Sequence, residues 1–180
     1  MNLKLSIIAL AVAGMLGCAN DQAPDVSAKI RDSLKQAGLT AVTVSQDRSK
    51  GVVTLGGNVN QDQQKAQAEQ IAKPLAAGQV VADEIAVLPD GNQSAVKTAD
   101  SDLDRGIQAN LDAALTRANI KGIHHSTKNA VVTLTGNVST PADRANAEHI
   151  ADGVPNVQQV VNEIDVRNQR ATSSSADRSK

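Results

Sequence analysis

Two nearly identical segments, VVTLGGNV at residues 52–59 and VVTLTGNV at residues 131–138, decide the organisation of this chain of 180 residues. They lie 79 residues apart, and at this offset 17 of the 36 positions in 52–87 are identical to those in 131–166. Self-similarity at a fixed spacing indicates repeated units, and two copies are too few for a solenoid. We therefore predict two tandem domains, residues 26–88 and 101–167.

Each copy repeats the same order of helices and strands. Apolar residues recur at helical spacing before and after the repeated segment, which itself forms the second strand of a predicted hairpin. Thr140 followed by Pro141 predicts a capping residue and a first helical position for the second helix of the second copy. A last Val-rich strand closes each unit, over 80–87 and 157–166.

The resulting αββαβ order predicts an α+β fold class. The hairpin pairs the first two strands antiparallel, and the helix between the second and third strands suits a right-handed parallel crossover. Each domain should be a three-stranded mixed sheet with two helices on one face and the other face open. Domains of this size are marginally stable alone, so we expect the open faces or the first helices to pack together.

The segments around the domains have different expected roles. Residues 89–100, with the turn-like sequence PDGN at 89–92, are predicted to be a linker that ends at a helix start at Ser101. Residues 168–180 lack apolar periodicity and are predicted to be a disordered tail.

The N-terminus has the pattern of a secretion signal. Lys4 precedes an apolar run of 12 residues, which is too short to span a bilayer, and the sole cysteine of the chain, Cys18, follows Gly17. The sequence MLGC at 15–18 resembles a bacterial lipobox. We therefore predict a signal peptide over 1–17, lipid attachment at Cys18 and a lipidated tether over 18–25. Ala19, in place of Asp, points to the outer membrane.

The αββαβ unit, the VVTLxGNV segment and the closing VVNEIDV at 160–166 resemble the BON domain family. The resemblance covers about 130 of the 180 residues. Behind a lipobox, two such domains are similar to dual-BON lipoproteins of the Gram-negative outer membrane, and the related osmotically inducible periplasmic protein has the same tandem. The resemblance implies association with membrane phospholipid, possible envelope-protein partners, and support of envelope integrity on the periplasmic side.

The residues offer little for catalysis or for cofactors. His124 and His125 are adjacent on a predicted strand and point to opposite faces, so they cannot chelate one metal together. The recurring Glu84 and Glu163 fall out of phase with the inward row of their strands and are expected to be solvated. No metal site, no cofactor and no catalytic residue is expected, and we predict that the protein is not an enzyme.

Composition also excludes one class of partner. The chain contains no Phe, Trp or Tyr and has a net charge of −1, so it has neither stacking platforms nor a basic surface for nucleic acid.

Four polar residues are predicted to be structural. Asp83 and Asn162 lie in the inward row of the third strands, where each must be hydrogen-bonded because its burial is otherwise costly. They are expected to tie the strand to a neighbouring loop, with a ligand contact as the alternative. Asn58 and Asn137 follow Gly residues at the end of the second strands and are expected to form a bend or turn.

Two surfaces are candidates for binding. Lys29, Arg31 and Lys35 on the first helix are candidate membrane-facing residues, each contributing about 1 kcal/mol near an anionic surface; a plain solvated face is the alternative. The second surface is the open sheet face, where Val52, Thr54, Val131 and Thr133 would point. Through it the protein would act as an interaction scaffold or holdase-like stress protein, which is the alternative to lipid association.

Overall fold

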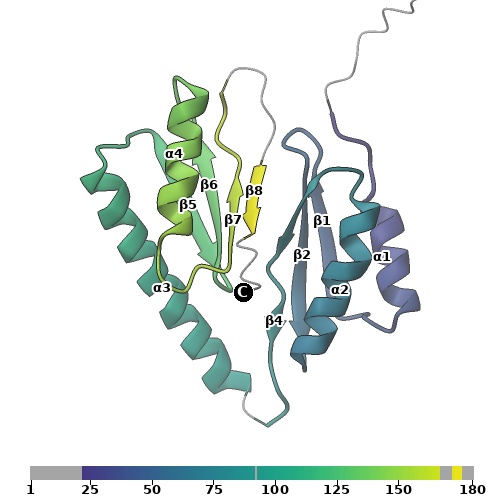
Figure 1. The fold of residues 1–180 in the computed structure, drawn as a ribbon. Coiled ribbons are helices and arrows are strands. Elements are labelled where there is room, and N and C mark those ends of the chain that lie inside the picture. The colour runs from purple at the N-terminus through teal and green to yellow at the C-terminus, as the bar shows by residue number, and fades with distance from the viewer. Residues whose placement is uncertain (1–21, 92, 167–171, 176–180) are drawn as a thin grey trace, which may run out of the picture.

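The structure, a computed structural model, describes residues 22–91 and 93–166 and the backbone of 172–175. The first domain consists of α1 (Ser27–Gln36), β1 (Val42–Asp47), β2 (Val52–Val59), α2 (Asp62–Leu75), β3 (Val80–Asp83) and β4 (Ala86–Val87). The second consists of α3 (Gln93–Arg117), β5 (Ile123–Lys128), β6 (Val131–Gly136), α4 (Pro141–Asp152), β7 (Gln159–Asn162) and β8 (Thr172–Ser175). The predicted tandem of αββαβ units is confirmed (Figure 1).

The two sheets have the predicted pairing. β1 pairs antiparallel with β2, and β2 pairs parallel with β3 and β4; β5, β6 and β7 repeat this arrangement. Each domain buries its own apolar core between sheet and helices. The core of the first domain includes Ile30, Leu34, Val53 and Leu55, and that of the second includes Ile107, Leu111, Val132 and Leu134. Both cores are aliphatic, as the absence of aromatic residues requires.

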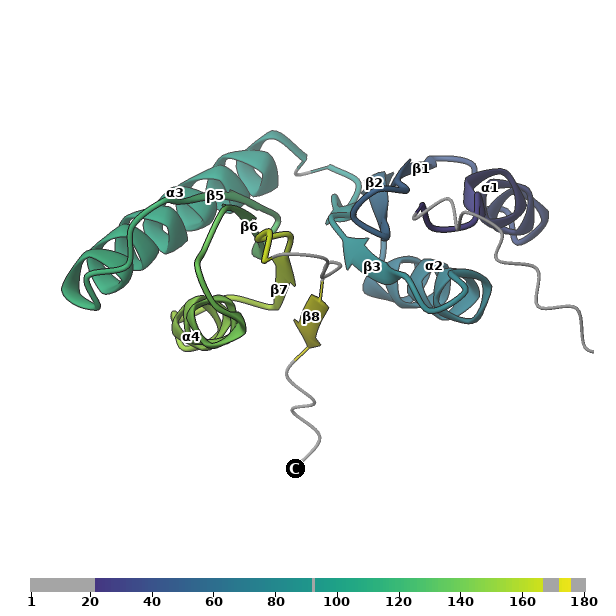
Figure 2. The same ribbon diagram turned by 90° about the horizontal axis from the view of Figure 1, so that it is seen from above.

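The two sheets face each other, and the helices lie on the outside. Figure 2 shows α1 and α2 beyond one sheet and α3 and α4 beyond the other, with the strands between them. A third apolar cluster, which we call the seam, joins the domains: Val52 and Ala82 of the first pack with Val131 and Val161 of the second. The expectation that the sheet faces pack together is confirmed. The expectation that they stay open is wrong over their inner halves, which are β2 and β3 in the first sheet and β6 and β7 in the second.

The predicted linker is wrong in its second part. Residues 93–100 are the first two turns of α3, which runs on without a break to Arg117. Ser101 therefore lies inside this helix, where its hydroxyl donates to the carbonyl of Lys97 at 2.9 Å. The cap-like sequence at 101 misled the prediction. Residues 93–100 contain no proline or glycine, so nothing in them prevents the helix from starting earlier. By contrast, Thr140 caps α4 as predicted, accepting from the Asp143 N–H at 3.1 Å.

The predicted disordered tail is wrong at residues 172–175. These residues form β8, which pairs antiparallel with β7 and gives the second sheet a fourth strand. The first three strands of that sheet match the prediction. Backbone hydrogen bonds form this pairing, so the apolar periodicity of the sequence could not predict it. The signal peptide and residues 18–21 of the predicted tether, including Cys18, lie outside the described residues, as do residues 168–171 and 176–180 of the tail. The tether prediction is wrong at residues 22–25, because Ala23 is buried and its N–H donates to the Arg48 carbonyl at 2.8 Å, which docks this segment on the first domain.

Candidate functional site

The seam buries residues that the sequence assigned to an open binding face. Val52 and Val131 are each 2% exposed, and Val161 is fully buried. Thr54 and Thr133 are half-buried beside them. What remains exposed of these faces lies on β1 and β5, and it carries Thr43, Ser45, His124 and Ser126. This strip is polar, so the sheet faces do not provide the apolar surface that a holdase-like function needs.

Charged side chains reach across both ends of the seam. Lys128 donates to the carboxylate of Glu84 at 2.8 Å, and Lys50 forms an ion pair with Asp165. Asn129 adds a hydrogen bond from its side-chain nitrogen to the carbonyl oxygen of Glu84 at 2.7 Å. The Lys50, Glu84 and Lys128 side chains are 26%, 18% and 60% exposed, so part of this pairing is shielded from water and salt.

Glu84 and Glu163 are therefore not solvated as the sequence suggested. Glu163 is half-buried, and its burial, followed by the nearby negative charge of Asp47, raises its pKa, while Lys50 opposes the shift. Both glutamates point out of the core of their own domain, as the strand period requires, but they meet the other domain instead of water. This could not be found from one repeat, because the partner lies in the other copy.

The side chain of Gln159, on β7, forms hydrogen bonds with the backbone at the edge of β3 that faces away from β2. Its side-chain oxygen accepts from the Asp83 N–H at 3.1 Å, and its side-chain nitrogen donates to the Val81 carbonyl at 2.7 Å. An unpaired strand edge is prone to pair with other chains. This amide therefore both protects the edge of the first sheet and joins the domains.

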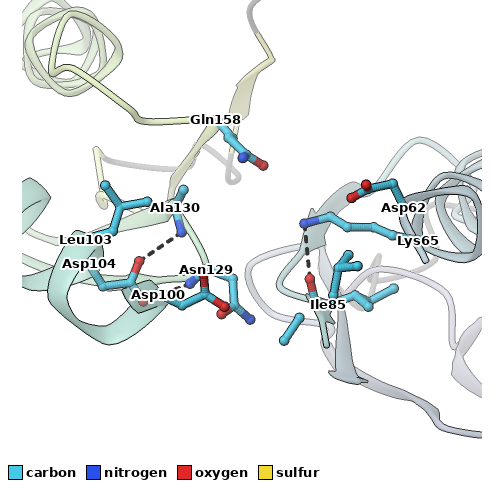
Figure 3. Close-up of a pocket in the computed structure, with 11 residues that line it drawn as sticks. Asp62, Lys65, Ile85, Asp100, Leu103, Asp104, Asn129, Ala130 and Gln158 are labelled. Carbon is cyan, nitrogen blue, oxygen red and sulfur yellow. Dashed lines mark hydrogen bonds between the residues drawn. The ribbon is translucent and has the colours of Figure 1, made fainter. Parts of the chain in front are cut away.

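A cleft of about 270 Å³ opens beside the seam (Figure 3). On one wall, Lys65 donates to the carbonyl oxygen of Ile85 at 3.1 Å. On the other, both carboxylate oxygens of Asp104 accept backbone N–H groups, from Asn129 and Ala130, at 2.9 Å each. Asn129 and Ala130 have positive φ angles of 50° and 63°, so Asp104 stabilises a strained hairpin turn. Lys65, Asp104 and Asn129 at this cleft are thus engaged in holding the fold.

Asp83 and Asn162 explain why each third strand is interrupted. The Asp83 carboxylate accepts from the Ile85 N–H at 3.2 Å, and the Asn162 side-chain oxygen accepts from the Ile164 N–H at 3.2 Å. A side chain that bonds the backbone two residues on replaces a ladder bond and turns the strand. These residues bond to their own strand instead of a neighbouring loop.

The Asn162 side chain is also hydrogen-bonded to α4, the second helix of its domain. In the second domain, the fully buried Asn162 donates to the Arg144 carbonyl at 3.1 Å and to the Glu148 carboxylate at 2.9 Å. Lys65 and Glu69 are the repeat equivalents of Arg144 and Glu148. A carboxylate at 83 cannot donate to Glu69 as an amide does. Burial accordingly raises the pKa of Asp83, and Lys65 partly offsets the effect.

Asp83→Asn is therefore expected to increase the free energy of unfolding at pH 7 by about 1 kcal/mol. The raised pKa means that the folded state favours the protonated carboxyl. The destabilisation of the wild type is thus complete above the folded-state pKa and vanishes below the unfolded-state pKa. Urea unfolding from pH 8 to pH 4 should show the gap closing as the pH falls. Asp32→Asn, at an exposed carboxylate, is the control; an unchanged gap for Asp83→Asn across this range would contradict the argument.

Asn58 and Asn137 do not form turns. Each is exposed, and the chain continues past it in extended form, with Asn58 opposite Ala86 and Asn137 opposite Asp165. The preceding Gly57 has a φ of 95°. The strand bends at the glycine and then pairs with the restarted third strand.

The basic residues of α1 are exposed but do not act as one group. Arg31 donates to the Val44 carbonyl at 3.3 Å, which ties its guanidinium to β1. Lys29 and Lys35 are also exposed, and within the described part of the chain their side chains form no hydrogen bond or ion pair. The outward position of α1 leaves the two lysines accessible to an anionic surface (Figure 2).

A groove of about 640 Å³ lies between α3 and α4, on the outer side of the second domain. Its apolar walls come from small and aliphatic residues: Ala113, Ala114, Ala118, Ile150, Val154 and Pro155. Arg117 and His149 are exposed polar residues among its lining. The groove therefore combines apolar walls with the positively charged side chain of Arg117. The sequence predicts both helices on one face of the sheet, but it does not show which of their residues face each other, so the groove could not be predicted.

The histidines are placed on opposite faces of β5, as predicted for His124 and His125. His125 is 10% exposed in its side chain and bonds the Asp112 carboxylate at 2.8 Å, so it faces the helices. In the described part of the chain, no group of three or more His, Cys, Asp or Glu residues is arranged to hold a metal ion. Over the same residues, no helix combines the length and apolarity needed to cross a membrane.

Comparisons with known proteins were made by family and by structure. A family model described as the BON domain matches residues 22–89 and again residues 99–168. A search of curated proteins found no match.

Two solved structures from Chlamydia trachomatis resemble the chain, both of CdsD, a structural protein of the type III secretion system. The C-terminal domain of CdsD has 12% identity and a TM-score of 0.30, with 77% of this chain and 64% of that chain covered. The second structure has 13% identity and a TM-score of 0.31, with 77% and 60% covered. The chain thus spans less than two thirds of either structure. The family model, however, matches most of the chain in two copies, and the protein therefore belongs to the BON domain family, with two BON domains in tandem.

Proposed function

We propose that the protein is a non-catalytic envelope lipoprotein that binds membrane phospholipid through the groove between α3 and α4. BON domains are generally associated with phospholipid binding, and BON-domain proteins with the periplasm or membranes. The observation that carries the proposal is the groove itself, which combines an apolar floor with Arg117. The proposal includes an acylated Cys18 in the outer membrane, with both domains on the periplasmic side, and a role in envelope integrity or stress tolerance.

The seam limits where such binding can occur. It covers the inner halves of both sheet faces, so the helical layers are the surfaces left for a bilayer (Figure 2). A guanidinium forms paired hydrogen bonds with phosphate oxygens, and it keeps its charge at any pH of interest. The apolar walls of the groove suit the glycerol and upper acyl part of the same lipid. A single phospholipid could therefore bind Arg117 through its phosphate and the apolar walls through its glycerol and upper acyl part.

The first domain supports the same orientation. Ala23 is buried on the first domain, so only residues 18–22 are left to extend, and they span at most roughly 18 Å. An anchor at Cys18 therefore keeps the first domain near the bilayer. Lys29 and Lys35 on α1 then each add about 1 kcal/mol near anionic lipid at low salt. This attraction is weak beside the acyl chains, which contribute about 0.8 kcal/mol per buried CH₂ group.

Charge reversal at Arg117 tests the groove. A soluble form that begins at Ala19 is mixed with vesicles of phosphatidylglycerol and phosphatidylethanolamine, and binding is measured by sedimentation. Arg117→Glu should lower the partition coefficient about thirtyfold, because an attraction of about 1 kcal/mol becomes a repulsion of about the same size. Lys97→Glu, an equal charge change at an exposed site on the same helix, should have a much smaller effect. Equal losses for both variants would assign binding to net charge, and no binding by the wild type would reject the lipid function.

Lipid attachment is tested separately in cells. Metabolic labelling with a fatty-acid analogue should mark the wild-type protein and leave Cys18→Ser unlabelled. Fractionation should then place the wild type with the outer membrane and Cys18→Ser in the soluble periplasmic fraction. Equal labelling of both proteins, or labelling of neither, would reject the anchor.

A further inference from the structure

The seam is built from the same positions of the two repeats. Val52 and Val131 are equivalent at the repeat offset of 79, and so are Ala82 and Val161. One pair from each domain forms the cluster. An interface in which the same patch is used on both sides is self-complementary, which is the property of a two-fold dimer contact.

One polar contact is repeated by the two-fold relation: the equivalent residues Lys50 and Asn129 donate to the carbonyl oxygens of the equivalent Glu163 and Glu84. The two ion pairs are not equivalent in the repeat, but both join a hairpin lysine to the opposite domain. Lys128, at the end of the β5–β6 hairpin, binds Glu84 just after β3 of the other domain. Lys50, in the β1–β2 hairpin, binds Asp165 and approaches the carbonyl oxygen of Glu163, just after β7. Glu84 and Glu163 are repeat equivalents. Each hairpin therefore supplies a lysine to the third strand of the opposite domain.

The connection between the domains is short and peripheral. Leu88 is 2% exposed and closes the first domain, with its N–H bonded to the Val59 carbonyl at 2.7 Å. Gly91 has a φ of 90°, a conformation that only glycine adopts readily, and α3 begins at Gln93. Most residues of the first two turns of α3 are exposed. The connection between β4 and α3 runs at the edge of the molecule, outside both cores (Figure 1), so a change of conformation at Gly91 need not alter either core.

We propose that two copies of this chain exchange domains through the seam. The first domain of one copy packs on the second domain of the other, and the reverse pair forms at the same time. Every seam contact of the single chain is remade in the dimer, and only the turn at Gly91 changes. A second copy is the occupant because it carries both halves of this self-complementary surface, and its Asp165 and Glu84 can accept the ion pairs of Lys50 and Lys128.

Complementary charge reversal tests the exchange. One chain carries Lys50→Glu and Lys128→Glu, and the other carries Glu84→Lys and Asp165→Lys. Within either chain the seam then sets like charges opposite each other, but domain exchange between the two chains restores both opposite-charge pairs. Native mass spectrometry in buffer without lipid should show a one-to-one heterodimer at least tenfold more abundant in the mixture than a dimer of either chain alone. No excess in the mixture overturns the proposal.

Two further variants make the result decisive. A chain with all four reversals should return to the melting temperature of a closed monomer, which verifies that the reversed pairs fit. Gly91→Val disfavours the turn and should raise the dimer fraction of the otherwise natural chain several-fold, while Gly106→Ala, at an exposed helical glycine with open space around it, should not. If the four-reversal chain does not close, Gly91→Val decides: a dimer fraction equal to that of the wild type rejects exchange. The assay contains no lipid, so its outcome is independent of the proposed phospholipid function.

Discussion

Gly136→Ala is expected to destabilise the second domain by at least about 3 kcal/mol. Gly136 has a φ of 124°, and a Cβ atom there would lie 2.2 Å from the carbonyl oxygen of Gly122. The methyl group therefore meets backbone that cannot rotate away, in addition to the backbone strain. Gly57 has the same surroundings in the first domain, with a Cβ position 2.2 Å from the carbonyl oxygen of Ala41. Urea unfolding followed by circular dichroism measures the loss, and Gly57→Ala should match it.

Gly106→Ala is the control for this prediction. Gly106 lies inside α3, and nothing is within 4 Å of a Cβ atom placed there. The same chemical change should stabilise the protein by about 0.5–1 kcal/mol, because alanine loses less backbone entropy in a helix. If Gly136→Ala were as mild as Gly106→Ala, the close crossing before β5 would not exist as described.

Val161→Asp is expected to separate the two domains. Val161 is fully buried in the seam, and a carboxylate there costs about 3–5 kcal/mol while the seam stays closed. In an isolated second domain the same position would lie on an open sheet face, so the chain escapes this cost by opening. One cooperative unfolding transition should become two, and the radius of gyration from X-ray scattering should rise. Both changes report the seam, not the core of the second domain.

Ser126→Asp provides the matched control. Ser126 lies on the same face of the second sheet, on β5, but it is exposed beyond the seam. This variant should keep a single transition and the radius of gyration of the wild type. Two transitions already present in the wild-type chain would mean that the domains fold independently and that the seam contributes little.

The seam explains why the interaction hypothesis based on open sheet faces does not hold for this chain. A small sheet with helices on one face must also cover the apolar residues on its other face. In this chain, the sheet of each domain covers the apolar residues of the other. Val52 and Val131 gave the strongest reason to expect a binding face, and they are the residues that join the domains. The molecule instead presents its helices, and the groove beside Arg117 combines apolar walls with a cation on this helical side.

Several local features could be predicted because their cause is local. The Thr140 cap, the bounds of β2 and the helical stripe of Ile30 and Leu34 depend on neighbours within a few residues. The start of α3 could not, since exposed turns with ordinary helix propensity have no apolar period to reveal them. Asp83 and Asn162 were correctly singled out as buried, but their actual partner, the N–H two residues on, depends on a strand break that the sequence did not indicate.

The repeat, the αββαβ order and the aliphatic core could all be predicted from the sequence, because period, capping and turn chemistry act over short distances and recur in both copies. The sequence also indicates that the domains need further burial, since each is small and lacks aromatic residues. How that need is met depends on contacts that form only in the folded chain. The inner halves of the two sheet faces meet each other, Glu84 and Glu163 meet lysines of the opposite domain, and the α3–α4 groove forms from residues 40 positions apart. These pairings join distant parts of the chain. Their energies depend on which two surfaces bury each other from water, and a local sequence pattern does not contain this information.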